Sequence, residues 1–359
     1  MTIEKRVETV IREDVRRIAA YHVQPASGLI KLDAMENPYP LPAPIAEAWR
    51  ARSTSISWGR YPDAEAAELK QLLREVFTID ARWDLILGNG SDELIQLLIT
   101  AIPADSVVVA PSPGFTMYRV ISEALQQKFV EVDLDDQFDL DVRSMCKVFE
   151  SERPRIVFLA SPNNPTANTF SEERLRSVIA AAPGLVVVDE AYFAFSNVDA
   201  AGWLAEFDNL LVMRTLSKLG LAGLRLGFLQ GHPRWIQELD KLRLPYNISS
   251  LDQAAAEVAL THFDLLREQA AEICSLREQL LESLTTLPGL TIFSSNANFI
   301  LVRTENCDAR DVHQQLKDRG VLIKCVAGTH ALLHNCLRIT VGAAEENAAL
   351  IKALRDILT

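Results

Sequence analysis

Short apolar segments alternate with helical patterns through the middle of the chain, and this alternation limits the possible folds more than any other feature. From about Trp83 onward, each segment is apolar on both faces, and a stretch of helical periodicity separates it from the next. Strands of this kind are typical of a largely parallel sheet buried between helices. The segments are DLILG at 84–88, SVVVA at 106–110, RIVFLA at 155–160, LVVVD at 185–189 and NLLVMRT at 209–215. We therefore predict an α/β fold with a mostly parallel central sheet covered by helices.

The pattern changes after Pro245, which indicates a second domain. A long helical stretch from Leu251 to Leu287 is followed by short apolar segments, a helix near 308–319 and a final helix. A chain of 359 residues has room for about two domains. We predict a large domain over residues 46–244 and a smaller α+β domain formed by residues 1–45 and 245–359.

Composition excludes several classes of protein. No apolar run approaches the roughly 18 residues of a membrane-spanning helix, and the charged N-terminal segment does not resemble a signal peptide, so we expect a cytoplasmic protein without a membrane partner. A net charge of −12 disfavours nucleic-acid binding, and the sequence contains no clear basic patch.

The five cysteines are odd in number and never spaced as CxxC, which disfavours a disulfide framework or a zinc site. His330 and His334 have a metal-like spacing but no evident third ligand, and we expect no metal.

Polar residues follow four of the apolar segments directly. Ligands bind at the carboxyl ends of strands in open α/β sheets, so these residues should meet at one edge of the sheet. The groups are Asn89-Gly90-Ser91-Asp92, Ser161-Pro162-Asn163-Asn164-Pro165, Asp189-Glu190 and Ser217-Lys218. Each group suits one part of a pyridoxal phosphate molecule.

The first group suits a phosphate. Gly90 allows close approach of the backbone, and Ser91 and Asp92 stand where a helix is predicted to begin, so free N–H groups and the positive end of the helix dipole can hold an anion. When these residues are taken alone, an ordinary helix cap explains them slightly better than a phosphate site does.

Two further groups suit the ring of the same molecule. Asp189 can pair with a protonated pyridine nitrogen, although a helix cap is an equal alternative. Tyr192 and Asn164 can each donate a hydrogen bond to the phenolic oxygen, and their alternatives are a half-buried tyrosine and a turn asparagine.

The segment TLSKLGLAGLRLG at 215–227 carries the most specific signal. Lys218 follows a hydroxyl residue directly after a buried strand, where desolvation and a cationic neighbour can lower the pKa of its amine and make it nucleophilic. Arg225 lies between two glycines, where its guanidinium can grip a phosphate with two hydrogen bonds. We therefore predict a site formed by Lys218, a phosphate and Arg225.

At these residues the sequence resembles the fold-type I pyridoxal-phosphate aminotransferases, and within them the histidinol-phosphate aminotransferases. The resemblance extends over nearly the whole chain, and its motifs are specific because they occur in this order. They include AMENPYPLP at 34–42, RYPD at 60–63, GNGSDELI at 88–95, PSPGFTMY at 111–118, SPNNPT at 161–166, VVVDEAYFAF at 186–195, LPYNISSLDQAA at 244–255, ANFILVR at 297–303 and CLRITVG at 336–342.

The resemblance implies the following roles at the cofactor. Lys218 is the Schiff-base lysine and proton carrier, Asp189 contacts the pyridine nitrogen, and Asn164 and Tyr192 contact the ring oxygen. Ser91, Asp92, Ser217 and Arg225 contact the phosphate, with Gly90 beside them, and Phe115 stacks on the ring.

The resemblance also implies roles for residues on the substrate side. Tyr61 reaches the cofactor phosphate from the other subunit, so a homodimer is implied. Arg338 binds the carboxylate or phosphate of the substrate, although a paired structural arginine is an alternative. Tyr21 closes over the substrate, and Asn164 lies beside it.

Three positions depart from the family pattern. Ala167 replaces the usual glycine after Asn-Pro-Thr, which should be harmless unless the turn needs a positive φ. Lys324 stands where an arginine assists with the substrate phosphate, and a lysine keeps the charge but loses the planar fork. Met35 replaces a common asparagine.

The activity implied is transamination between histidinol phosphate and 2-oxoglutarate, an amino donor and a 2-oxo acid. An aromatic aminotransferase, or a decarboxylase of the threonine-phosphate type, is the alternative on the same fold. A non-catalytic effector-binding protein is less consistent with the sequence, because the first forty residues contain no helix-turn-helix and every chemical residue is present.

Overall fold

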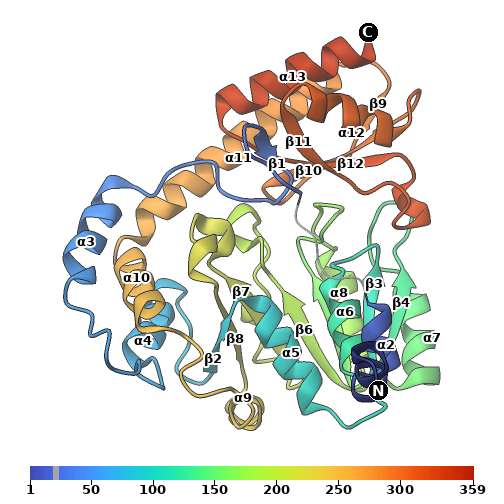
Figure 1. Cartoon of the computed structure of the whole chain (residues 1–359). Coiled ribbons are helices and arrows are strands. Elements are labelled where there is room, and N and C mark those ends of the chain that lie inside the picture. Colours follow the sequence, from blue (N-terminus) through green and yellow to red (C-terminus); the bar gives the residue numbers. More distant parts are fainter. Residues whose placement is uncertain (19–23) are drawn as a thin grey trace.

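The computed structural model describes residues 1–18 and 24–359. The predicted substrate residue Tyr21 lies outside the described residues. The structure contains two β-sheets, and helices pack around both of them (Figure 1). Within the described ranges, no helix is both long enough and apolar enough to cross a membrane.

The larger sheet has seven strands in the order β2-β8-β7-β6-β5-β3-β4. The strands are β2 (Asp84–Asn89), β3 (Val107–Ser112), β4 (Lys128–Asp133), β5 (Ile156–Ala160), β6 (Leu185–Asp189), β7 (Leu210–Thr215) and β8 (Leu226–Gly231). All neighbouring pairs are parallel except those of β8, which runs antiparallel to both β2 and β7. The prediction of a mostly parallel sheet is confirmed.

Helices cover both faces of this sheet. In β6, Val187 belongs to one apolar cluster, whereas Val186 and Val188 belong to another, because successive side chains of a strand point to opposite faces. The first cluster includes α5 (Ser91–Ala101), α6 (Met117–Ala124) and α9 (Pro233–Asp240), and the second includes α7 (Val142–Glu152) and α8 (Glu172–Ala181). Burial on both sides is what strands without a polar face require.

The smaller sheet has five strands in the order β1-β11-β12-β10-β9. The strands are β1 (Ile30–Leu32), β9 (Leu290–Ile292), β10 (Phe299–Thr304), β11 (Val321–Cys325) and β12 (Cys336–Thr340). β1 pairs in parallel with β11, so the N-terminal segment joins a sheet built from the C-terminal part of the chain. The helices that pack around this sheet are α11 (Phe263–Thr285), α12 (Ala309–Asp318) and α13 (Ala344–Leu358). The domain bounds 46–244, 1–45 and 245–359 stay a prediction.

The remaining helices lie at the ends and sides of these layers. They are α1 (Ile3–Val10), α2 (Glu13–Arg17), α3 (Ala43–Ser53), α4 (Ala67–Val76) and α10 (Ser250–Thr261), together with the short helices η1 (Phe193–Phe195), η2 (Ala200–Trp203), η3 (Ser217–Leu219), η4 (Ala222–Leu224) and η5 (Ala331–Leu333). The single helical stretch predicted after Pro245 is two helices, α10 and α11, because the backbone leaves the helical region at His262.

Candidate active site

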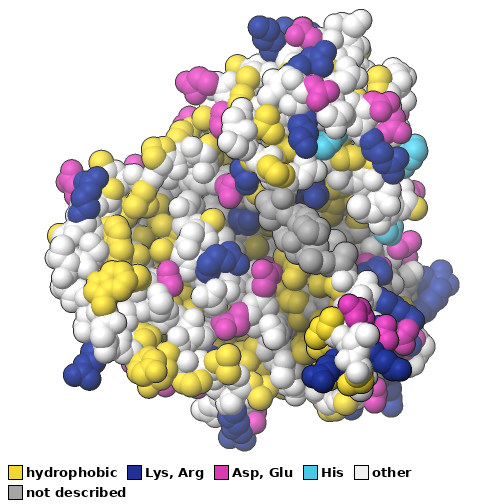
Figure 2. All heavy atoms as spheres, viewed as in Figure 1, with side chains coloured by type: hydrophobic (Ala, Val, Ile, Leu, Met, Phe, Trp, Pro, Cys, Tyr) yellow, Lys and Arg dark blue, Asp and Glu magenta, His cyan; other side chains and the backbone are white. Residues whose placement is uncertain are grey.

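The predicted polar residues gather at one edge of the seven-stranded sheet. The carboxyl ends of β2, β5, β6 and β7 share this edge, because the four strands run in the same direction. The residues at these ends are Gly90 after β2, Asn164 after β5, Asp189 at the end of β6, and Ser217 and Lys218 after β7. In Figure 2, Lys and Arg side chains lie between the part of the molecule that holds the smaller sheet and the part that holds the larger one.

Lys218 lies in η3, directly after β7, and is partly buried. The pKa of its amine is lowered to about 8. Burial is the main cause, and the neighbouring Arg338 guanidinium is the second. The Nζ atom lies 5.6 Å from the centre of the Tyr192 ring. Because only the neutral amine is nucleophilic, this environment lets Lys218 react with a carbonyl group near neutral pH.

Asp189 is a buried carboxylate at the end of β6, with 4% of its surface exposed. Its Oδ2 accepts a hydrogen bond of 2.6 Å from the Tyr118 hydroxyl, and its Oδ1 accepts one of 3.0 Å from the Ala191 N–H. Burial raises the pKa of Asp189 to about 6 despite these two donors. No Lys, Arg or His among the described residues forms an ion pair with Asp189, so the carboxylate suits a cationic ligand group such as a protonated pyridine.

Tyr192 and Asn164 lie next to each other in the same site. Burial raises the pKa of the Tyr192 hydroxyl, and a side-chain hydrogen bond joins it to Asn164. Arg338 donates a hydrogen bond of 2.6 Å from its Nη1 to the Asn164 Oδ1, and one of 2.7 Å from its Nη2 to the backbone oxygen of Asp33. The Asn164 amide oxygen is therefore engaged by Arg338, which leaves the Asn164 NH₂ group as the donor for a ligand.

The start of α5 forms a cradle for an anion. Gly90 has a φ of +81° and stands just before the first turn, and a Cβ atom at this position would lie only 2.7 Å from a terminal nitrogen of Arg225. A Cβ atom at Gly227 would lie 3.0 Å from the Ser91 backbone nitrogen. The Arg225 guanidinium thus lies against Gly90 at the start of α5, where free backbone N–H groups suit a phosphate.

The two other predicted phosphate residues lie beside this cradle. The Asp92 carboxylate lies 3.7 Å from the Arg225 guanidinium. Because this carboxylate would repel a phosphate, Asp92 can bind one only through its backbone N–H. The Ser217 hydroxyl accepts a hydrogen bond of 2.8 Å from Thr215, and its own hydrogen can point to a ligand.

Phe115 and Tyr118 connect the ring-stacking position to Asp189. The two aromatic rings meet edge to face at 5.4 Å, and Tyr118 donates to Asp189 as described above. Tyr118 belongs to the motif PSPGFTMY, but the sequence predicts no role for it. Nothing in the local sequence pattern shows that Tyr118 meets Asp189, because the two residues are 71 positions apart.

Lys324 and Arg338 stand directly opposite each other on β11 and β12. Directly opposed residues of an antiparallel pair point to the same face of the sheet, so the two cations lie on one side. Lys324 is exposed and Arg338 is buried. The smaller sheet thus presents two positive charges, and one of them reaches the site through Asn164.

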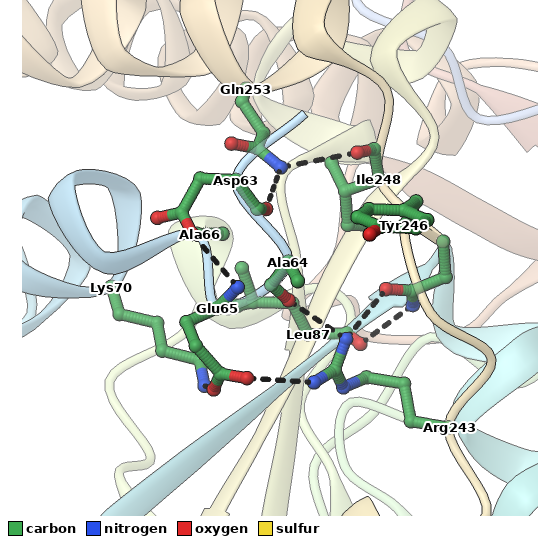
Figure 3. A pocket seen from close by; sticks show the side chains of 11 residues that line it. Asp63, Ala64, Glu65, Ala66, Lys70, Leu87, Arg243, Tyr246, Ile248 and Gln253 are labelled. Carbon is green, nitrogen blue, oxygen red and sulfur yellow. Dashed lines mark hydrogen bonds and ion pairs between the residues drawn. The ribbon is translucent and has the colours of Figure 1, made fainter. Parts of the chain in front are cut away.

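Tyr61 is not brought into the site of its own chain. Its side chain is 80% exposed and stacks on Tyr246 at a centroid distance of 4.6 Å. Figure 3 shows how the following loop is fixed near Tyr246: Gln253 donates to the Asp63 backbone oxygen at 2.9 Å, and Arg243 donates to the Ala64 backbone oxygen at 3.0 Å. Tyr61 is therefore presented outward from an ordered loop.

Two departures from the family pattern fall on positive φ angles. Ala167 has a φ of +68° and Met35 a φ of +53°. Because a residue with a β-carbon is strained at a positive φ, the replacement of glycine by Ala167 is not harmless. We expect it to cost about 1 kcal/mol. Asparagine, which is common in the family at the second position, also tolerates this region better than methionine.

The described residues contain no group of three or more His, Cys, Asp or Glu side chains that could hold a metal ion. His330 instead lies 3.1 Å from Asp133, at the end of β4.

A partly buried lysine with a lowered pKa, a buried carboxylate and an anion cradle at the carboxyl edge of a parallel sheet define a pyridoxal-phosphate enzyme by fold and site. The chain belongs to the aminotransferase class I and II family, which it matches over residues 27–357. It is 50% identical to histidinol-phosphate aminotransferase 2 of Nitrosococcus oceani, with 98% of each chain covered. It is 46% identical to histidinol-phosphate aminotransferase of Chromobacterium violaceum, with 97% of this chain and 98% of the relative covered.

Solved structures agree with this assignment. The histidinol-phosphate aminotransferase of Sinorhizobium meliloti, solved in complex with pyridoxal-5′-phosphate, has a TM-score of 0.87 and 25% identity, with 98% of both chains covered. The histidinol-phosphate aminotransferase of Clostridium acetobutylicum has a TM-score of 0.84, 21% identity, and coverage of 92% of this chain and 99% of that chain, and it supports the fold alone. The protein is a fold-type I aminotransferase, and its cofactor is pyridoxal 5′-phosphate.

Proposed function

We propose that this enzyme transfers an amino group from histidinol phosphate to 2-oxoglutarate, giving imidazole acetol phosphate and glutamate. The relatives named above support this donor. The observation that carries the proposal is the cross-strand pair of Lys324 and Arg338, because two cations on one face of a sheet suit a doubly charged phosphate. The same pair suits the carboxylates of glutamate and 2-oxoglutarate in the second half of the reaction.

The reaction depends on Lys218. When bound, pyridoxal phosphate supplies an aldehyde carbon and a ring that withdraws electrons from the substrate α-carbon. The Lys218 amine would hold the cofactor through the aldehyde carbon. When a substrate amine is bound there instead, the Lys218 amine would be the group that moves a proton at the substrate α-carbon, which its lowered pKa allows near neutral pH.

The other site residues hold the cofactor in place. Asp189 would pair its negative charge with the ring nitrogen, Tyr192 and Asn164 would donate to the ring oxygen, and Phe115 would stack on the ring. Gly90, Ser91 and Asp92 would hold the phosphate through backbone N–H groups, and Ser217 and Arg225 would hold it through their side chains.

The active unit is a homodimer in the cytoplasm. Tyr61 supports this assembly, because it is 80% exposed and held outward from its own chain. In the dimer it reaches the cofactor phosphate of the partner subunit. Tyr21, which the described residues do not include, closes over the substrate.

A panel of amino donors tests the activity. Glutamate formation from 2-oxoglutarate is measured with histidinol phosphate, histidinol, phenylalanine, tyrosine and leucine, and carbon dioxide release is measured with threonine phosphate. We expect the highest kcat/KM with histidinol phosphate, and a loss of about tenfold or more with histidinol, which lacks the phosphate. A preference for phenylalanine or tyrosine would favour an aromatic aminotransferase, and carbon dioxide release without glutamate would favour a decarboxylase.

Variants of the paired cations link this result to the site. Lys324→Ala should raise the KM for histidinol phosphate about tenfold and change the KM for histidinol little, because histidinol carries neither a phosphate nor a carboxylate. An equal effect on both donors would show that Lys324 does not contact the phosphate.

A further inference from the structure

The strongest unassigned contact of the site is the hydrogen bond between Tyr118 and Asp189. The Tyr118 hydroxyl lies 2.6 Å from the Asp189 Oδ2. Tyr118 is 2% exposed, and its ring stacks on Phe158 at 4.6 Å with the two planes 6° apart. Phe115 closes the ring edge at 5.4 Å. The hydroxyl is therefore held in place by a rigid core on α6 and β5.

This hydroxyl donates to a carboxylate that burial pushes toward its neutral form. Burial is the largest cause of the raised pKa of Asp189, while the bonds from Tyr118 and Ala191 act in the opposite direction. The hydroxyl of Tyr118 has its pKa raised well above the usual value by burial and by Asp189, so it keeps its proton and remains a donor. Each carboxylate oxygen thus has one donor from the protein, and one further partner can bind.

We propose that Tyr118 is a positioning residue that keeps the proton shared by Asp189 and the cofactor on the ring nitrogen. The proposal rests on the role of Asp189 proposed above. A donor hydrogen bond stabilises the charged carboxylate over the neutral acid, so Asp189 stays an anion and the ring nitrogen stays a cation. Without the hydroxyl, the proton passes from the nitrogen to the carboxylate oxygen, and the ring loses the charge that makes it an electron acceptor.

Other charges around Asp189 do not replace this hydroxyl. Asp92, on α5, favours protonation of Asp189, and Lys218 after β7 opposes it. The Tyr192 hydroxyl also interacts with Asp189 electrostatically. Among these described groups, only Tyr118 has a side chain within hydrogen-bond distance of the carboxylate.

The test uses holoenzyme loaded with cofactor that carries ¹⁵N at the ring nitrogen. The ¹⁵N chemical shift, measured by NMR at neutral pH, separates the protonated from the unprotonated nitrogen. For the wild type we expect the protonated shift, and for Tyr118→Phe a move toward the unprotonated shift. The same variant should lose about 10- to 100-fold in kcat, the range expected for one lost hydrogen bond to a charged group, with little change in the KM of the donor.

Two control variants make the result decisive. Tyr39→Phe also removes a tyrosine hydroxyl, one without a hydrogen bond within the described residues, and should keep the wild-type shift. Asp189→Asn should lose the protonated shift. If Asp189→Asn loses it and Tyr118→Phe keeps it, with only a lower melting temperature, Tyr118 fills space and the inference is wrong. If Asp189→Asn also keeps it, the proposed role of Asp189 fails first.

Discussion

Lys218 is the residue whose chemistry depends most on its surroundings. Its amine has a pKa of about 8 in the folded chain against 10.5 ordinarily, because burial and Arg338 disfavour the charged form. We expect the rate at which the apoenzyme captures pyridoxal phosphate to rise with pH through about 8 and then to level off, since only the neutral amine reacts. Stopped-flow absorbance measures this rate, and a midpoint near the ordinary pKa would contradict the environment described.

The same shift affects the stability of the apoenzyme. Between pH 8 and 10.5 the unfolded chain holds a proton on this lysine that the folded chain has lost. Stability therefore rises with pH across this window, and the contribution is absent in Lys218→Ala. Arg338→Gln should move the capture midpoint upward, because it removes the second cause of the shift.

Residues at the ends of strands were predictable from the sequence, because the carboxyl ends of parallel buried strands lie at the same edge of the sheet. Lys218 and Asp189 are of this kind. Tyr118 was missed because its partner Asp189 is 71 positions away, and nothing in the local pattern shows which carboxylate a helix residue will meet. The Asp92 side chain was also beyond prediction, since the sequence places it at a helix start but does not show that it faces Arg225.

At the scale of elements, a buried ion pair joins β6 to β7 behind the site. Glu190 follows β6, and its Oε2 accepts a hydrogen bond of 2.8 Å from Arg214 in β7. The Arg214 guanidinium also lies 5.2 Å from the Phe193 ring and 5.8 Å from the Phe77 ring. The pair connects the strands that carry Asp189 and lead into Lys218.

Breaking this pair should destabilise the fold strongly. Arg214→Met leaves Glu190 buried without its cation, and we expect the free energy of unfolding to fall by about 3 kcal/mol. The double variant Arg214→Met with Glu190→Met should recover most of this loss, because no buried charge remains. Urea unfolding measures both variants, and a single-variant cost under about 1 kcal/mol would show that the pair is unimportant.

The sequence predicted which segments form strands, but it did not predict the order of the strands in the sheet. The apolar segments identified five strands of the large sheet, because strands buried on both faces have a clear signature. The position of β8, antiparallel between β2 and β7, depends on pairings that are distant in sequence and leave no local pattern. The break between α10 and α11 rests on the backbone of the single residue His262, which helical periodicity does not reveal.

At the scale of the whole molecule, the site joins the two sheets. Arg338 from the smaller sheet contacts Asn164, which follows a strand of the larger one. The family resemblance predicted both residues, but the sequence pattern did not show that they touch. Tyr61 is 80% exposed and stacks on Tyr246, and its role across a dimer interface stays a prediction.

Subunit mixing tests that role. Lys218→Ala and Tyr61→Ala should each reduce activity strongly at limiting cofactor. If Tyr61 acts across the interface, a mixed dimer has one site with both defects and one site with neither. Unfolding and refolding an equal mixture should then restore about a quarter of the wild-type activity, because half of the dimers are mixed. Activity no higher than the average of the two parents would place Tyr61 in its own subunit's site, or outside any site.

The most direct test of the account is to find the lysine that holds the cofactor. Borohydride reduction of the holoenzyme fixes pyridoxal phosphate to its lysine, and mass spectrometry of the peptides locates the modified residue. We predict that the modification is on Lys218, and that the Lys218→Ala variant carries none. Modification of a different lysine in the wild type, or wild-type activity in Lys218→Ala, would contradict the site described.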